Sequence, residues 1–182
     1  MTVLSSAAFR RGVLIAGVAA LLAACGTEKP VPPCPPVRVD NTTAALTKFQ
    51  DEHGRDLTDV AYEVRVVGYK GYCKFDKKGR GVDVVMDLVL DVASGPAAKS
   101  GEIEIPYFVA LPQFFPAPDG KHVFQVRHHL EPGTGHRARI DENDVHVYIP
   151  LKKDEPAAAF DVYVGLQLTP EELAYNRSLQ QK

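Results

Sequence analysis

A period-two alternation of apolar and polar residues is the feature that most constrains what this chain can fold into. In the segment 82–92 every second residue is apolar, and Asp83, Asp87 and Asp91 stand among the residues between them. Successive side chains of a strand point to opposite faces, so this pattern predicts a strand with one buried and one solvated face. The same alternation recurs at 62–66, 103–111, 124–130, 145–149 and 160–168.

Segments with the composition of turns separate these strands. They are 77–81, 94–96, 118–120, 132–135 and 141–144. With a seventh strand expected within 37–49, the pattern predicts an all-β antiparallel sandwich of about seven strands, immunoglobulin-like in architecture. The chain has no tryptophan and Cys34 precedes the first strand, so the inter-sheet disulfide of antibody domains is not expected. Pro106 predicts an edge or a bulge in its strand.

The C-terminal segment has helix signals instead. Thr169 suits the N-cap, Pro170 suits the first helical position, and Glu172 stands where a capping box requires it. We predict one short helix over 170–180, with a disordered end beyond Arg177 as the alternative.

The first 24 residues have the organisation of a cleaved export signal. Arg10 and Arg11 precede an uncharged apolar run, 12–24, which is shorter than the about 20 residues that span a bilayer. The run ends in Leu22-Ala23-Ala24-Cys25, a small pair before a cysteine whose thiolate can form a thioether with a lipid. This arrangement resembles the lipobox of bacterial lipoproteins.

The resemblance implies that Cys25 becomes the first mature residue and carries a diacylglycerol and a further acyl chain, commonly palmitate. Two or more chains anchor a protein stably to a membrane. Because Gly26 is not an aspartate, we expect the outer membrane, with the protein facing the periplasm. An ordinary signal peptide that happens to meet a cysteine is the alternative.

Residues 25–36 then form the lipidated cysteine and a proline-rich tether, and 37–182 form a single domain. With Cys25 assigned to lipid, Cys34 and Cys73 remain in an oxidising compartment, where we expect them to form a disulfide. Two free thiols are the alternative. The formal net charge of −2 and the lack of a polybasic stretch argue against nucleic-acid binding, and no stretch reinforces membrane binding.

Five of the six histidines lie between residues 122 and 146, which raises the possibility of a metal site. His128 falls on an apolar face, whereas His129 and His146 fall on outward faces and meet only if their strands pair. We expect no metal site here, and His129 and His146 are the residues that would take part in one.

No nucleophile elbow, dinucleotide motif or phosphate loop is present, so we predict no enzymatic activity and no cofactor. The run 107–116 is richer in aromatic and apolar residues than one buried face requires. Phe108, Phe114 and Phe115 are therefore candidates for binding a partner protein. Burial within the sandwich or under the C-terminal helix is the alternative.

The segments 95–98, 107–111 and 166–177 resemble those of a group of small alphaproteobacterial β-sandwich lipoproteins, which implies a host lineage but no mechanism. We expect a lipid-anchored protein of the cell envelope, a non-enzymatic structural or protein-interaction module with an envelope protein as partner. A periplasmic domain that binds a small ligand or a metal through 122–146 is the alternative.

Overall fold

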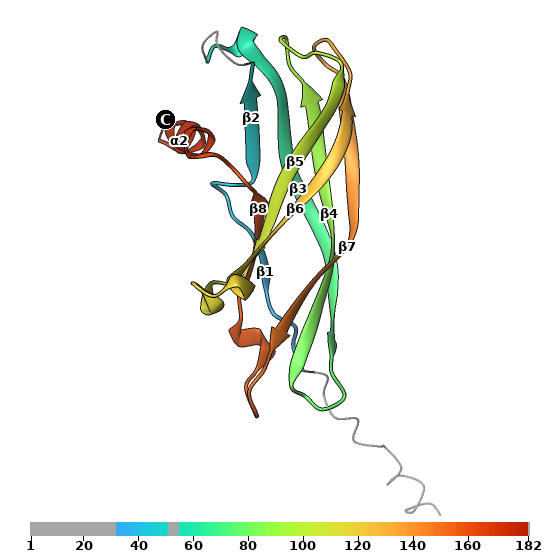
Figure 1. Cartoon of the computed structure of the whole chain (residues 1–182), viewed down its shortest axis with the longest axis vertical. Helices are drawn as coiled ribbons and strands as arrows, with labels where there is room; N and C mark the ends of the chain where they lie inside the picture. Colours follow the sequence, from blue (N-terminus) through green and yellow to red (C-terminus); the bar gives the residue numbers. More distant parts are fainter. Residues whose placement is uncertain (1–31, 51–54, 182) are drawn as a thin grey trace, which may run out of the picture. The chain divides into compact units, whose positions relative to one another are not determined.

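In the computed structural model, which describes residues 32–50 and 55–181, the chain folds into two four-stranded sheets (Figure 1). The signal segment 1–24 and the lipidation residue Cys25 lie outside the described residues. The strands are β1 (Val37–Val39), β2 (Ala45–Phe49), β3 (Val60–Phe75), β4 (Gly81–Ser94), β5 (Gly101–Ala110), β6 (Lys121–Leu130), β7 (Arg137–Pro150) and β8 (Val162–Leu166). The predicted all-β sandwich is confirmed.

One sheet has the strand order β1-β8-β5-β6 and the other has the order β2-β3-β4-β7. Neighbouring strands pair antiparallel, except that β1 runs parallel to β8. The segment 37–49, from which one strand was expected, contributes β1 to the first sheet and β2 to the second.

The core consists of the inward faces of the two sheets, and β4 contributes the most regular of them. Its alternate apolar residues are at most 3% exposed: Val82, Val84, Met86, Leu88, Leu90 and Val92. The other sheet contributes equally buried side chains from β5 and β8: Ile105, Tyr107, Val109, Val162, Val164 and Leu166. Burial of one such side chain stabilises the fold by about 1.5–3 kcal/mol, so the alternation seen in the sequence is the main source of stability.

The prediction of a turn at 141–144 is wrong, because these residues lie inside β7. The register between β4 and β7 shifts here, so that Asp87 faces both Asn143 and Asp144. Asp144 has a φ of 57°, and its backbone N–H donates to Asp87 Oδ1 at 3.1 Å. A β-bulge accommodates the extra residue, and Asn and Asp tolerate this left-handed conformation better than most residues.

Pro106 lies in an inner strand, contrary to the expectation of an edge strand. The pairing of β5 with β8 covers only Tyr107–Ala110, and the Pro106 carbonyl accepts a hydrogen bond from Gln167 N at 2.9 Å. Pro106 therefore lies just beyond the residues of β5 that pair with β8. At this position the missing N–H of proline leaves no gap in the hydrogen bonds between β5 and β8.

Cys34 and Cys73 form the predicted disulfide, with their Cα atoms 5.8 Å apart. The bond joins the segment that precedes β1, in one sheet, to β3, in the other. It therefore holds the N-terminal end of the described chain against the sandwich.

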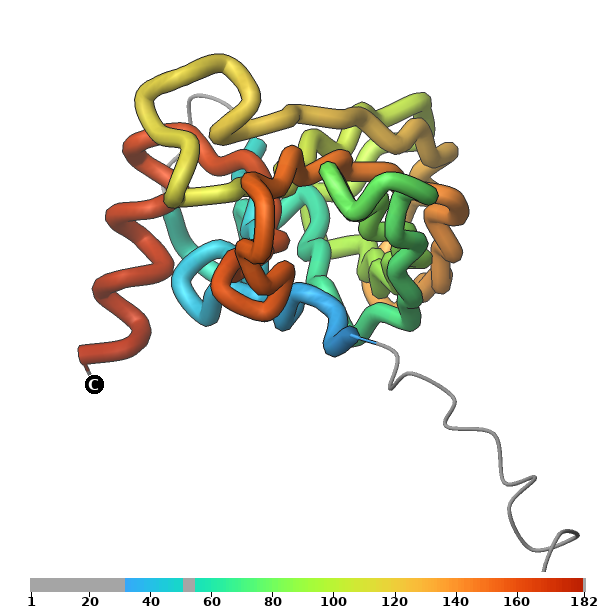
Figure 2. Tube along the Cα trace, turned by 90° about the horizontal axis from the view of Figure 1, so that it is seen from below, coloured from blue at the N-terminus to red at the C-terminus, as the bar shows by residue number. Residues whose placement is uncertain are grey.

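The predicted C-terminal helix is confirmed as α2 (Pro170–Gln180), with Thr169 and Glu172 forming the capping box. Figure 2 shows α2 along one flank of the domain, beside the segment 40–50. The buried Asn176 Nδ2 donates to the carbonyl oxygens of Thr42 at 2.9 Å and Ala45 at 2.7 Å. These bonds fix the helix to the start of β2.

Four 3-10 helices occupy connections in the described part of the chain. They are η2 (Leu57–Asp59), η3 (Pro112–Phe114), η4 (Pro118–Gly120) and η5 (Ala157–Ala159). Over the same residues, no helix has both the length and the apolar character needed to cross a membrane.

We predict that Asn176→Ala lowers the free energy of unfolding by about 1–3 kcal/mol, because two carbonyl groups at the helix contact lose their donor. Urea unfolding followed by circular dichroism measures the change. Ser178→Ala is the matched control: its exposed hydroxyl donates to Tyr175 O within the helix, and we expect a change below about 0.5 kcal/mol. Equal midpoints for the two variants would show that Asn176 does not secure α2.

Candidate interaction surfaces

The three candidate aromatic residues have different surroundings. The Phe114 ring stacks on Phe160, with centroids 5.5 Å apart and planes 10° apart, and packs against the core. Phe108 is half-buried on β5, with Lys121 Nζ 4.4 Å from the centre of its ring. Phe115 is 81% exposed. Among the three, only Phe115 offers a ring to a partner without rearrangement of the domain.

Phe108 depends on a glycine beneath it. A Cβ atom built on Gly165 of β8 would lie 3.0 Å from Phe108 Cε1 and 2.0 Å from Thr43 Oγ1. Gly165 and Phe108 are also paired in register between β8 and β5. Phe108 thus fills space over a neighbouring strand, which is a packing role.

Short contacts hold the loop that carries Phe115. Phe115 N donates to Pro112 O at 3.1 Å, and Gln113 Nε2 donates to Ala159 O at 3.2 Å in η5. The first of these bonds closes a turn within the loop. The bond from Gln113 and the stacking of Phe114 on Phe160 attach the loop to the end of the sandwich. An exposed ring on a held loop binds a partner at little cost in conformational entropy.

His129 and His146 do not come together. His129 lies on β6 in the first sheet, and its Nδ1 is 3.0 Å from Glu102 Oε1. His146 lies on β7 in the second sheet, and its Nδ1 is 3.0 Å from Asp83 Oδ2. The strands do not pair, so the arrangement in which the two imidazoles would meet does not occur. Within residues 32–50 and 55–181, no cluster of three or more His, Cys, Asp or Glu side chains is arranged to hold a metal ion.

The aspartates on the solvated face of β4 each have a partner on β7. Asp83 contacts His146, Asp87 accepts from the Asp144 N–H, and Asp91 accepts from Arg139 Nε at 3.0 Å and a second guanidinium nitrogen at 3.4 Å. The hydrogen bond from Arg139, with attraction from Arg139 and Arg137, lowers the pKa of Asp91. These carboxylates are thus compensated across the strands.

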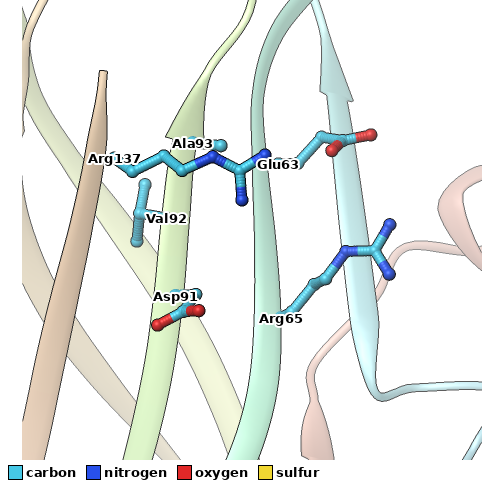
Figure 3. A pocket seen from close by; sticks show the side chains of 6 residues that line it. All are labelled: Glu63, Arg65, Asp91, Val92, Ala93 and Arg137. Carbon is cyan, nitrogen blue, oxygen red and sulfur yellow. The ribbon is translucent and has the colours of Figure 1, made fainter. Parts of the chain in front are cut away.

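A hollow of about 310 Å³ lies on this face (Figure 3). It is lined by Glu63, Arg65, Asp91, Val92, Ala93 and Arg137. Ala93 lies between Glu63 and Arg137 in the strand register, and the Arg137 side chain reaches from β7 across Ala93 towards β3. The small alanine creates the hollow. Its lining alternates acid and base, which favours water and offers no selective site for an anion or a cation.

Sequence reasoning also missed the buried polar contact between Tyr107 and Glu142. Tyr107 is 1% exposed between the sheets, and its hydroxyl donates to Glu142 Oε1 of β7 at 3.1 Å. The Tyr107 ring stacks on Phe124 with centroids 5.1 Å apart. Burial, reinforced by the Glu142 charge and the hydrogen bond, raises the pKa of Tyr107. The signal in the sequence was an acidic residue at an inward position of β7, which the assumption of a turn concealed.

Comparisons of the chain with protein-family models, with curated proteins and with solved structures found no match.

We predict that the burial of Tyr107, reinforced by Glu142, makes stability decrease at alkaline pH. Because the folded-state pKa of Tyr107 is raised, the unfolded chain releases this proton first, near pH 10, and loss of stability begins there. The slope from this residue is at most about 1.4 kcal/mol per pH unit. Tyr107→Phe should remove it. Urea unfolding of both proteins between pH 8 and about pH 11 makes the comparison, and parallel stability curves would contradict the assignment.

Proposed function

We propose that this chain is a lipid-anchored protein of the bacterial cell envelope, held through Cys25 at the outer membrane and facing the periplasm. The Cys34–Cys73 disulfide carries the proposal, because disulfides persist in oxidising compartments and are rare in the cytosol. It agrees with the export signal and the lipobox read from the sequence. Of the three cysteines, one then carries the lipid anchor and the other two form a structural disulfide.

We further propose that the domain is a non-enzymatic interaction module whose partner is another envelope protein. Phe115 supports this proposal, since a large aromatic residue that is 81% exposed on a held loop resembles the anchor residues of protein interfaces. The placement of His129 and His146 on different sheets gives no support to the alternative of a metal site that uses both of them.

Crosslinking in intact cells tests the interaction module. We expect the wild-type protein to form discrete crosslinks with envelope proteins, and Phe115→Asp to reduce their yield at least about tenfold, as loss of an interface hot spot would. Phe114→Asp is unsuitable, because it would place a charge against Phe160 and disturb the fold.

Leu57→Asp is the matched control, because Leu57 is another exposed apolar residue, 75% accessible, in η2. It should leave the crosslinks unchanged. Equal crosslink yields from wild type and Phe115→Asp, at equal protein abundance, would overturn the assignment of Phe115.

A further inference from the structure

Cationic side chains from two distant segments meet at one end of the sandwich. Lys77, Lys78 and Arg80 are exposed in the turn between β3 and β4, and Lys152 and Lys153 are exposed just after β7. We call these five residues the basic end. The two segments adjoin, because Leu151 N donates to Arg80 O at 2.8 Å and Gly81 pairs with Pro150. Figure 1 shows the turn and the end of β7 at the same end of the domain.

The acidic residues nearby are largely engaged with their own turns. Asp76 Oδ1 accepts from the backbone N–H of Lys78 at 3.0 Å and of Arg80 at 2.7 Å. Glu155 Oε2 accepts from Lys152 N at 2.8 Å. Asp154 is the third acid of these segments and is exposed. Both bonded carboxylates thus point towards the backbone.

The five cations of the basic end remain available. None of them forms an ion pair with any residue of the described ranges. Five cations against three acids make this end positive, whereas the whole chain has a formal net charge of −2. A positive surface on an acidic protein favours an anionic partner.

The disulfide connects this end to the anchor. Cys73 lies two residues before the end of β3, beside the turn that carries Lys77 and Lys78, and it is bonded to Cys34. Nine peptide steps separate Cys34 from Cys25, and a chain of that length spans at most about 30 Å. A tether this short keeps the basic end at a high effective concentration beside the anchoring membrane.

We infer that the basic end binds the phosphate-bearing headgroups of the anionic membrane in which Cys25 is anchored, and so sets the orientation of the domain. This inference rests on the proposed lipid anchor. Lys and Arg side chains are attracted to anionic bilayers within about one Debye length, roughly 8 Å at physiological salt, so the basic end must lie on the surface to act. The sequence shows no polybasic stretch because the cations come from two segments, one before β4 and the other after β7.

The test uses the mature protein purified from membranes and reconstituted into vesicles. An amine-reactive reagent labels the protein, and mass spectrometry measures the rate of labelling at the four lysines of the basic end and at Lys99. Lys99 is exposed in the β4–β5 connection. Because β4 runs from the basic end to that connection, Lys99 lies at the other end of the strand and serves as the internal control. The vesicles contain phosphatidylglycerol with phosphatidylethanolamine, or phosphatidylcholine alone.

In the anionic vesicles, we expect labelling of the four lysines to slow at least about threefold relative to Lys99, and the protection to vanish at about 0.5 M NaCl. In phosphatidylcholine, both ends should label alike. Lys77→Glu with Lys78→Glu should abolish the protection of Lys152 and Lys153, and Lys99→Glu should not.

Equal labelling of the two ends in anionic vesicles would overturn the inference, as would protection that persists in phosphatidylcholine or at high salt. Protection seen in cells but not in vesicles would overturn it in favour of an acidic partner protein. Incorporation of labelled palmitate into the same preparation reports separately on the anchor. An unacylated chain would contradict the proposed function, and its labelling beside added anionic vesicles would still test the basic end.

Discussion

The apolar face of β4, formed by every second residue from Val82 to Val92, is the constraint on which the rest of the structure depends. β4 lies between β3 and β7, and its inward residues Val82 to Val92 pack against β5 and β8 of the other sheet. A shift of one residue in its pairing would turn Asp83, Asp87 and Asp91 into the core. The cost of burying three carboxylates therefore fixes the register, and the register places His146 and Arg139 beside Asp83 and Asp91.

The remaining elements are short and need separate attachments. β1 has only three residues and pairs on one side with β8, and β2 is attached through β3 and α2. The disulfide secures the chain before β1 and closes a loop with a sequence separation of 39. On the chain-entropy model such a loop contributes roughly 4 kcal/mol. Asn176 performs the corresponding task for α2, so both ends of the domain are attached by specific bonds.

Local patterns predicted the strands and the helix, because alternation and capping act over short distances in the sequence. The disulfide was predicted from the number of cysteines and the oxidising compartment. Local patterns failed where the same residue types have different roles in different tertiary surroundings. Asn143 and Asp144 have the composition of a turn but form a bulge inside β7. Phe114 and Phe115 are adjacent and alike, yet one stacks on Phe160 and the other is exposed. The basic end was invisible because Lys78 and Lys152 become neighbours only through the pairing of β4 with β7.

Export of the domain, with one cysteine in lipid and two in a structural bond, is tested most directly by the intact mass of the protein purified from membranes without reductant. We predict a chain that begins at Cys25, carries acyl chains, and takes up a thiol-alkylating reagent only after reduction. A chain without acyl groups, or one that is alkylated at both Cys34 and Cys73 before reduction, would contradict the account.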